Sequence, residues 1–197
     1  MKVKEVITET MRLVGREDAA DAIASFVPEY GNDGVQTNSL PDDIARLKRA
    51  FLTYLNAVLD ELARGYFPLD TEEEMSSENG VYAFADFLKG PIKINRVTED
   101  EKPIGWHICP NYLHAKAKKV TVFYEYAPPT LTENDEFFYP VFAVGARLVE
   151  YGMAAEYFLV AGDGSAYSAW ENKYRNEIEN LLSKSSVRGR IPPRRWI

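Results

Sequence analysis

The chain of 197 residues has little of what exported, disulfide-bonded or membrane-spanning proteins need. Its single cysteine, Cys109, cannot form an internal disulfide, so packing alone must stabilise the fold. The longest apolar runs, such as 139–144 and 157–161, are far shorter than the roughly 20 residues that cross a bilayer. The opening residues run into an amphipathic pattern without an apolar signal region. We therefore expect a soluble, non-membrane protein that folds in a cytosol.

Residues suited to catalysis are also scarce. The chain has only two histidines, His107 and His114, and no recognisable serine or cysteine nucleophile lies near them. Adjacent acids such as Asp42-Asp43 and Glu72-Glu73-Glu74, at a helix start or in a loop, are typical of solvated surface and not of a tuned acid–base pair. We expect no catalytic residues, no cofactor and no enzymatic activity. A small hydrolase would need convergent polar groups that the sequence does not supply.

Three residues of metal-binding type lie within eight positions of one another: His107, Cys109 and His114. Imidazole and thiolate are zinc ligands, but a closed structural site needs four ligands at matched spacings. The chain has no further cysteine or histidine to complete such a site. We interpret the three as ordinary strand residues and expect no metal.

Charge is distributed unevenly along the chain. The net charge is −7, yet residues 184–197 hold five basic side chains and no acidic one. The remaining residues hold 18 basic and 30 acidic side chains, a net charge of −12. A block of like charge at a terminus is typical of an interaction arm that seeks acidic protein or nucleic acid. The alternative is a disordered tail that only improves solubility.

Hydrophobic periodicity predicts two short helices and one long one in the first third of the chain. Apolar residues spaced by three and four indicate a helix from Val3 to Val14 that ends near Gly15, and a second short piece over 18–26. Residues 29–34 are typical of a loop. The long helix begins after Pro41 and continues to about Arg64, where Gly65 and Pro68 end it.

Residues 69–129 change to short β-prone pieces separated by Gly, Pro and charged clusters. Candidate strands are 92–98, 104–109 and 120–126, which we expect to form one small antiparallel sheet. The acidic run 99–102 is typical of an exposed hairpin turn, although it lacks the Asn-Gly pair that favours one.

The last third returns to a helical pattern after the acidic loop 132–136. One helix is expected from about Pro140 to Val160 and a second from Ala166 to Ser183, joined by a tight turn at 162–165 and paired antiparallel. Trp170 and Tyr174 are expected in the core. The fold class is therefore α+β: a bundle of about four helices with a small β insertion. We expect one globular domain over 1–183 and an extended basic arm over 184–197.

The arm combines proline-stiffened backbone, guanidinium groups and a terminal aromatic side chain, a composition typical of docking peptides. Its candidate partner-binding residues are Arg188, Arg190, Ile191, Pro192, Pro193, Arg194, Arg195, Trp196 and Ile197.

The order of these features resembles a known family. The features are the early helix 4–14, the long helix 41–68, a β insertion that closes with Val122-Phe-Tyr-Glu-Tyr-Ala-Pro-Pro129, and the final helix pair with Gly162-Asp163 and Trp170-Glu-Asn-Lys-Tyr174. In this order the chain is similar to the head-to-tail connector adaptors of tailed bacteriophages, of the tail tubular protein A type.

The resemblance implies a structural virion protein at the head–tail junction, assembled in the host cytoplasm. It implies a homo-oligomeric ring of about twelve subunits that docks on the portal protein through an extended C-terminal segment, here 187–197. A downstream tail or nozzle protein would bind the other side of the ring, and double-stranded DNA would pass through without specific binding. The alternative, from the charge pattern, is a nucleic-acid-associated regulatory protein that uses the basic arm.

Overall fold

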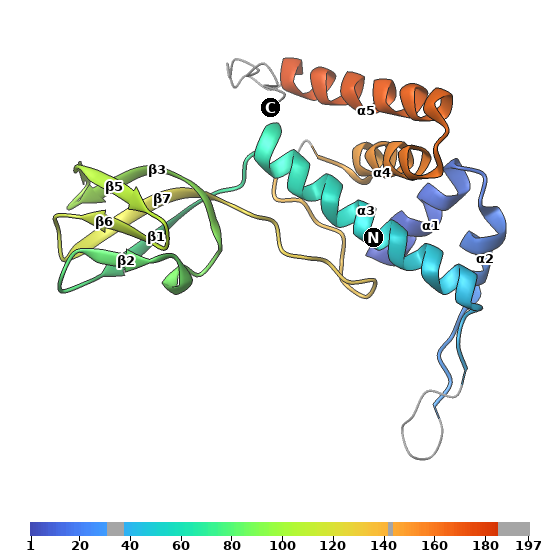
Figure 1. Ribbon diagram of the computed structural model, residues 1–197, viewed down its shortest axis with the longest axis horizontal. Coiled ribbons are helices and arrows are strands. Elements are labelled where there is room, and N and C mark those ends of the chain that lie inside the picture. The colour runs from blue at the N-terminus through green and yellow to red at the C-terminus, as the bar shows by residue number, and fades with distance from the viewer. Residues whose placement is uncertain (31–37, 142–143, 185–197) are drawn as a thin grey trace. The chain divides into compact units, whose positions relative to one another are not determined.

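A computed structural model of the chain describes residues 1–30, 38–141 and 144–184 (Figure 1). The described residues form five α-helices, a short 3-10 helix and two antiparallel sheets, so the predicted α+β class is confirmed. They divide into two compact units. The helical unit contains residues 1–59 and the described residues from Thr130 onward, and the β unit contains Asp60–Pro129.

The helical unit begins with two short helices, α1 (Val3–Leu13) and α2 (Glu17–Ser25), as the periodicity predicts. The apolar stripe of α1, which includes Val6, Ile7 and Met11, is buried against α2 and α4. Gly15 separates α1 from α2 with φ at +78°, a left-handed conformation that suits a residue without Cβ.

The long helix α3 (Asp42–Gly65) has almost the bounds that the sequence predicts. Two acids occupy its first turn, where the positive end of the helix dipole favours them. Phe51, Leu55 and Val58 are buried in the helical unit, and the division between the two units falls within this helix, after Leu59.

The segment 130–136, which follows the β unit, is hydrogen-bonded to α3 and to the start of α1. Asn56 of α3 binds both backbone groups of Leu131: its Nδ2 donates to the carbonyl at 3.0 Å, and its Oδ1 accepts from the N–H at 2.8 Å. The N–H of Val3 donates to the carbonyl of Asp135 at 3.0 Å. A side chain of α3 and the start of α1 therefore hold this loop.

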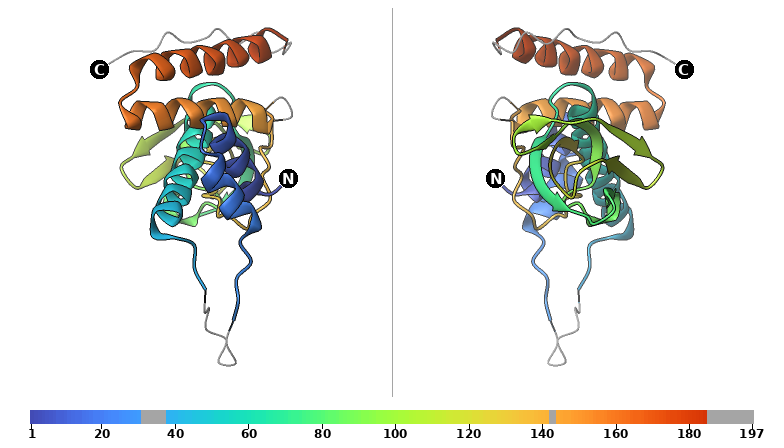
Figure 2. Two further views of the ribbon diagram at one scale, coloured as in Figure 1. Left: turned by 90° about the vertical axis from the view of Figure 1, so that its right-hand side faces the viewer. Right: turned by 90° about the vertical axis from the view of Figure 1, so that its left-hand side faces the viewer.

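The final helix pair is α4 (Ala146–Ala161) and α5 (Gly164–Lys184), which lie side by side (Figures 1 and 2). The predicted start of α4 at Pro140 is wrong by six residues. Gly145 has extended backbone (φ −95°, ψ 168°), and the helix begins only after it, because glycine stabilises a helix poorly. The tight turn is confirmed: Gly162 has φ +77°, and the Asp163 carboxylate accepts from the Ala166 N–H at 3.0 Å.

The β unit contains seven strands where the sequence predicts three. They are β1 (Asp70–Ser76), β2 (Val81–Ala83), β3 (Pro91–Glu99), β4 (Lys102–Pro103), β5 (Trp106–Cys109), β6 (Tyr112–Ala115) and β7 (Lys119–Tyr126), with a 3-10 turn at Phe84–Asp86. One sheet has the order β1-β7-β3-β4 and the other β2-β6-β5. Strand β7 lies between β1 and β3, and its inward side chains Val120, Val122 and Tyr124 are buried.

The expectation of a single sheet is wrong. The hairpin at 99–102 forms between β3 and β4, with Asp100 and Glu101 at φ 48° and 65°, so two acids adopt the conformation that Asn-Gly usually supplies. Strand β4 has only two residues, and the chain then leaves the first sheet. The predicted strand 104–109 starts two residues late and pairs with β6 in the second sheet.

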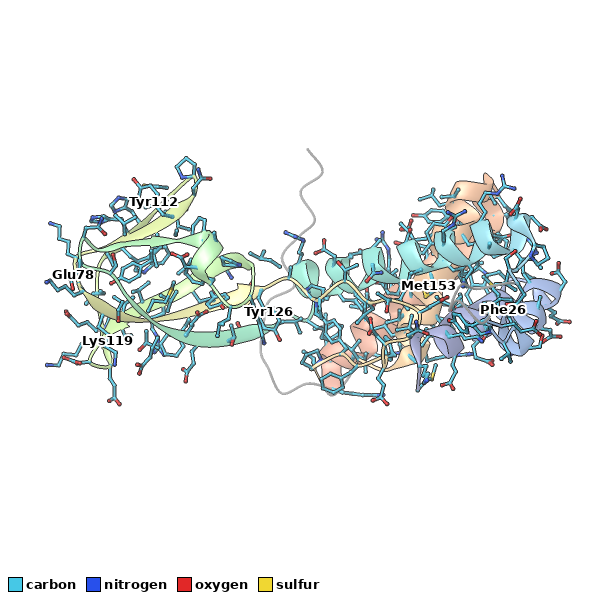
Figure 3. All side chains as sticks on the ribbon, turned by 90° about the horizontal axis from the view of Figure 1, so that it is seen from below. Phe26, Glu78, Tyr112, Lys119, Tyr126 and Met153 are labelled. Atoms are coloured by element: carbon cyan, nitrogen blue, oxygen red, sulfur yellow. The ribbon has the colours of Figure 1, made fainter. Side chains whose placement is uncertain are left out.

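Gly152 of α4 lies close to side chains of two other helices in the helical unit. A Cβ atom at this position would lie 2.9 Å from Cγ1 of Val58 on α3 and 3.1 Å from the ring of Tyr174 on α5. Val58 and Tyr174 are each 2% exposed. The next residue, Met153, is fully buried, and Figure 3 labels it within the helical unit. The absence of a side chain at 152 therefore permits three helices to meet.

We predict that Gly152→Ala destabilises the protein, because the added methyl group would displace the stiff, buried Val58 side chain. Overpacking of this kind costs about 1–3 kcal/mol, and the better helix propensity of alanine returns at most about 1 kcal/mol. Because Val58 is stiff and buried, we expect the upper part of this cost, a net loss of about 2 kcal/mol that lowers the melting temperature by several degrees, as measured by circular dichroism.

The matched control is Gly164→Ala at the start of α5, where an added Cβ meets no atom within 4 Å. This variant should be neutral or slightly more stable than wild type. If Gly152→Ala has the same melting temperature as the Gly164→Ala control, then position 152 has room for a methyl group and the contact with Val58 is contradicted.

Candidate interaction surfaces

The nine partner-binding residues that the sequence predicts, from Arg188 to Ile197, lie outside the described residues. The described chain ends with Lys184, the last residue of α5, so the arm follows this helix in the sequence. Within the described residues we find three surfaces that could bind a partner.

The first surface is the outer face of the four-stranded sheet. Side chains alternate along β1 and β7, so the residues not used in the core of the β unit point away from it. The outer sheet face is formed by Asp70, Glu72, Glu74, Lys93, Arg96, Thr121, Phe123 and Glu125. Hollows run along this face and continue to Glu101 at the β3–β4 turn.

Arg96 lies at the centre of the outer sheet face. Its guanidinium carbon is 4.0 Å from the centre of the Phe123 ring, a cation–π arrangement between neighbouring strands. Lys93 pairs with Glu125 at 2.6 Å and Lys119 pairs with Glu74 at 2.8 Å, so two of the acids have cationic neighbours. The face therefore presents charges of both signs around one stacked arginine, a chemistry that suits polar protein surfaces.

The expected position of Glu72-Glu73-Glu74 at a helix start or in a loop is wrong. All three acids belong to strand β1. Glu72 and Glu74 point outward, whereas the Glu73 carboxylate accepts hydrogen bonds from the Tyr124 hydroxyl at 2.8 Å and from the Leu88 N–H at 3.1 Å. Glutamate is rare in strands, so propensity alone does not find β1.

Burial first, and then the hydrogen bond to the Glu73 carboxylate, raises the pKa of Tyr124 to about 12. Tyr124 is 1% exposed and also packs edge-on against Phe87, with ring centres 5.0 Å apart. Tyr124 therefore has a structural role on the inner face of the sheet, where its phenol stays in the neutral form.

The second surface is the C-terminal end of α4. Leu159 and Val160 are 52% and 69% exposed, next to an aromatic cluster in which the Tyr157 ring lies 5.4 Å from Phe51. Burial also raises the pKa of the neighbouring Tyr54. Exposed aliphatic side chains beside aromatic ones are typical of surfaces that contact other proteins.

Of the two aromatic residues expected in the core on α5, one is there and the other is not. Tyr174 is buried as expected. Trp170 is only half-buried: its ring lies 5.8 Å from Tyr151, and the Lys173 ammonium lies 3.9 Å from its centre. The expectation for Trp170 is wrong, because the position lies at the margin of the α4–α5 contact.

The third surface is one face of the β5–β6 hairpin. His107 lies directly opposite His114, and Cys109 lies opposite Tyr112. The described residues contain no group of three or more His, Cys, Asp or Glu side chains arranged to hold a metal ion.

None of the described helices combines the length and apolar character that a membrane span requires.

Comparison with models of known protein families and with curated proteins finds no match for this chain.

We predict that Tyr124→Phe destabilises the protein at neutral pH by about 1–2 kcal/mol, because Glu73 loses a buried hydrogen-bond donor. The raised pKa of Tyr124 also makes the stability of the protein fall as the pH rises above 10. An unfolded tyrosine titrates near pH 10, so the stability that neutral Tyr124 contributes is complete below pH 10 and is lost as pH rises to about 12. Urea unfolding at several alkaline pH values measures this change.

The difference between wild type and Tyr124→Phe should therefore shrink from pH 10 to pH 12. Glu72→Gln, on the outer face of the same strand as Glu73, is the control and should stay within about 0.5 kcal/mol of wild type. A difference that stays constant with pH would mean that Tyr124 ionises equally in the folded and unfolded states.

Proposed function

We propose that this chain is a structural subunit of a head-to-tail connector ring of a tailed bacteriophage and has no enzymatic activity. In the proposed assembly, about twelve copies form a ring at the head–tail junction of the virion, and assembly takes place in the host cytoplasm. The portal protein binds on one side and a downstream tail or nozzle protein on the other. Double-stranded DNA passes through the ring without specific binding.

The observation that carries the proposal is the order of the elements along the chain. Short helices, one long helix, a β insertion and a final helix pair follow one another, and the basic arm comes next. This is the order on which the resemblance to connector adaptors rests. In the proposed subunit, helices α1, α3, α4 and α5 form the bundle, and the arm extends after Lys184, the last residue of α5 and the first that the sequence assigns to the arm.

The composition of the arm favours a protein partner. Four arginines can form paired hydrogen bonds with carboxylates, which lysines cannot match, and two prolines reduce the entropy lost on docking. Trp196 adds a large apolar side chain of the kind that dominates binding energy in interfaces. We assign the contact with the portal to residues 187–197.

The acidic charge of the rest of the chain supports the part of the proposal that concerns DNA. Residues before the arm carry a net charge of −12, which repels phosphate. A channel built from such subunits would let DNA slide without adhering. The outer sheet face, with its acids around Arg96, is suited to the downstream protein partner.

The test is binding to purified rings of the portal protein that is encoded with this chain. Full-length protein should bind the portal and form rings visible by electron microscopy, whereas a variant that lacks residues 187–197 should bind at least about 100-fold more weakly, because interface energy concentrates in a few anchoring residues. Sedimentation of mixtures measures binding, and circular dichroism confirms that the shortened protein is folded.

Two matched variants separate specific docking from simple charge attraction. Replacement of the arginines at 188, 190, 194 and 195 by lysine keeps the charge but should weaken docking, because lysine cannot make paired contacts. Trp196→Ala removes only the aromatic anchor and should weaken docking as well.

Normal docking by the shortened protein would remove the role of the arm. The alternative function, a nucleic-acid-associated regulator, predicts instead that full-length protein binds duplex DNA with steep salt dependence and that the shortened protein does not.

A further inference from the structure

The only two histidines of the chain lie directly opposite each other on neighbouring strands. His107 of β5 pairs with His114 of β6, and the centres of their rings are 4.7 Å apart with 34° between the ring planes. Seven positions separate them in the sequence, and the hairpin fold brings them together. They share one face of the hairpin with Cys109 and Tyr112, which pair two residues further along the strands.

This face can be reached from solvent. His107 is exposed and His114 is half-buried, so an ion could approach both imidazoles without opening the fold. Figure 3 labels Tyr112, which marks the hairpin in the β unit. The opposite face of β6 contributes to the core through Leu113 and Ala115, which are 0% and 1% exposed, whereas Ile108 on that face of β5 is 55% exposed. The pairing of Ile108 with Leu113 and of Cys109 with Tyr112 defines the register that places the two histidines opposite each other.

The ring separation fits the binding of a single metal ion. A zinc–imidazole bond of about 2.0–2.1 Å places each ring centre about 3.2 Å from the metal, so the centres of two bound rings lie about 4.5 Å apart at a bond angle of about 90° and about 5.2 Å apart at the tetrahedral angle. The observed 4.7 Å lies within this range. To bind one ion, the two rings must each direct one nitrogen to a common point.

We propose that His107 and His114 form an open binding site for a divalent transition-metal ion such as Zn²⁺, Ni²⁺ or Cu²⁺, with water in the remaining coordination positions. The site differs from the closed four-ligand site that the sequence excludes, because it needs only two protein ligands. Neither Cys109 nor Tyr112 is a ligand. The inference does not depend on the proposed connector role.

Two imidazoles held side by side bind one ion as a chelate. The second metal–nitrogen bond forms at a high effective concentration, so the pair binds far more tightly than one imidazole. Affinity should be highest for Cu²⁺, as expected for nitrogen ligands among divalent first-row metals. Strand β5 is an edge strand of the second sheet and pairs only with β6 among the described strands. The bound ion would therefore link this edge strand to its neighbour.

The test is isothermal titration of untagged full-length protein with the metal ion alone, first Ni²⁺ and then Zn²⁺ and Cu²⁺. We expect one ion per chain. His107→Gln and His114→Gln should each lower the affinity about 100-fold or more, since each leaves a single imidazole. Cys109→Ser is the matched control on the same face and should bind the metal as wild type does.

Folding of each variant is checked by circular dichroism without metal, and His107→Gln changes an exposed side chain that the core does not use. A second measurement is the melting temperature, which excess metal should raise for wild type and for Cys109→Ser but not for the histidine variants. Unchanged affinity in either histidine variant would overturn the site. So would loss of binding in Cys109→Ser, or a ratio of one ion to two chains, because each would require a different set of ligands.

Discussion

At Gly152 three helices come together because one of them has no side chain there. The methyl groups of Val58 on α3 and the ring of Tyr174 on α5 occupy the space that a Cβ would need. Helix α4 can therefore bury Leu148, Val149 and Met153 around this point. Protein interiors are close-packed, so a side chain added at position 152 would displace Val58 and Tyr174.

The β unit depends in a similar way on its central strand. Strand β7 alternates strictly between buried and less buried side chains, and Tyr124 on its inner side binds the carboxylate of Glu73. Because the inner side is committed to packing and to this hydrogen bond, the other side is free to hold charges around Arg96 and Phe123. The same alternation in β6 places His114 on the face away from Leu113, and His107 of β5 lies directly opposite His114. Interaction surfaces in this unit are thus by-products of where the core lies.

The accuracy of the sequence-based expectations followed the strength of each local signal. Helix α3 has a long periodic stripe with clear start and stop residues, so its bounds were predictable. Strand β1 reads Asp-Thr-Glu-Glu-Glu-Met-Ser, which has little β propensity, and its pairing with β7 prevails over that preference. The turn at Asn79-Gly80 was a usable signal for the nearby strands: Gly80 has φ +72°, and a Cβ there would lie 2.2 Å from the Ala115 carbonyl oxygen.

The sequence by itself determined the helices with regular apolar spacing, the mixed α+β class and the basic composition of the last residues, because these depend on neighbours along the chain. The tertiary structure alone decided that the strands form two sheets and that His107 faces His114. Each of these depends on contacts between distant segments, where burial of a shared core outweighs the weak preferences of individual residues.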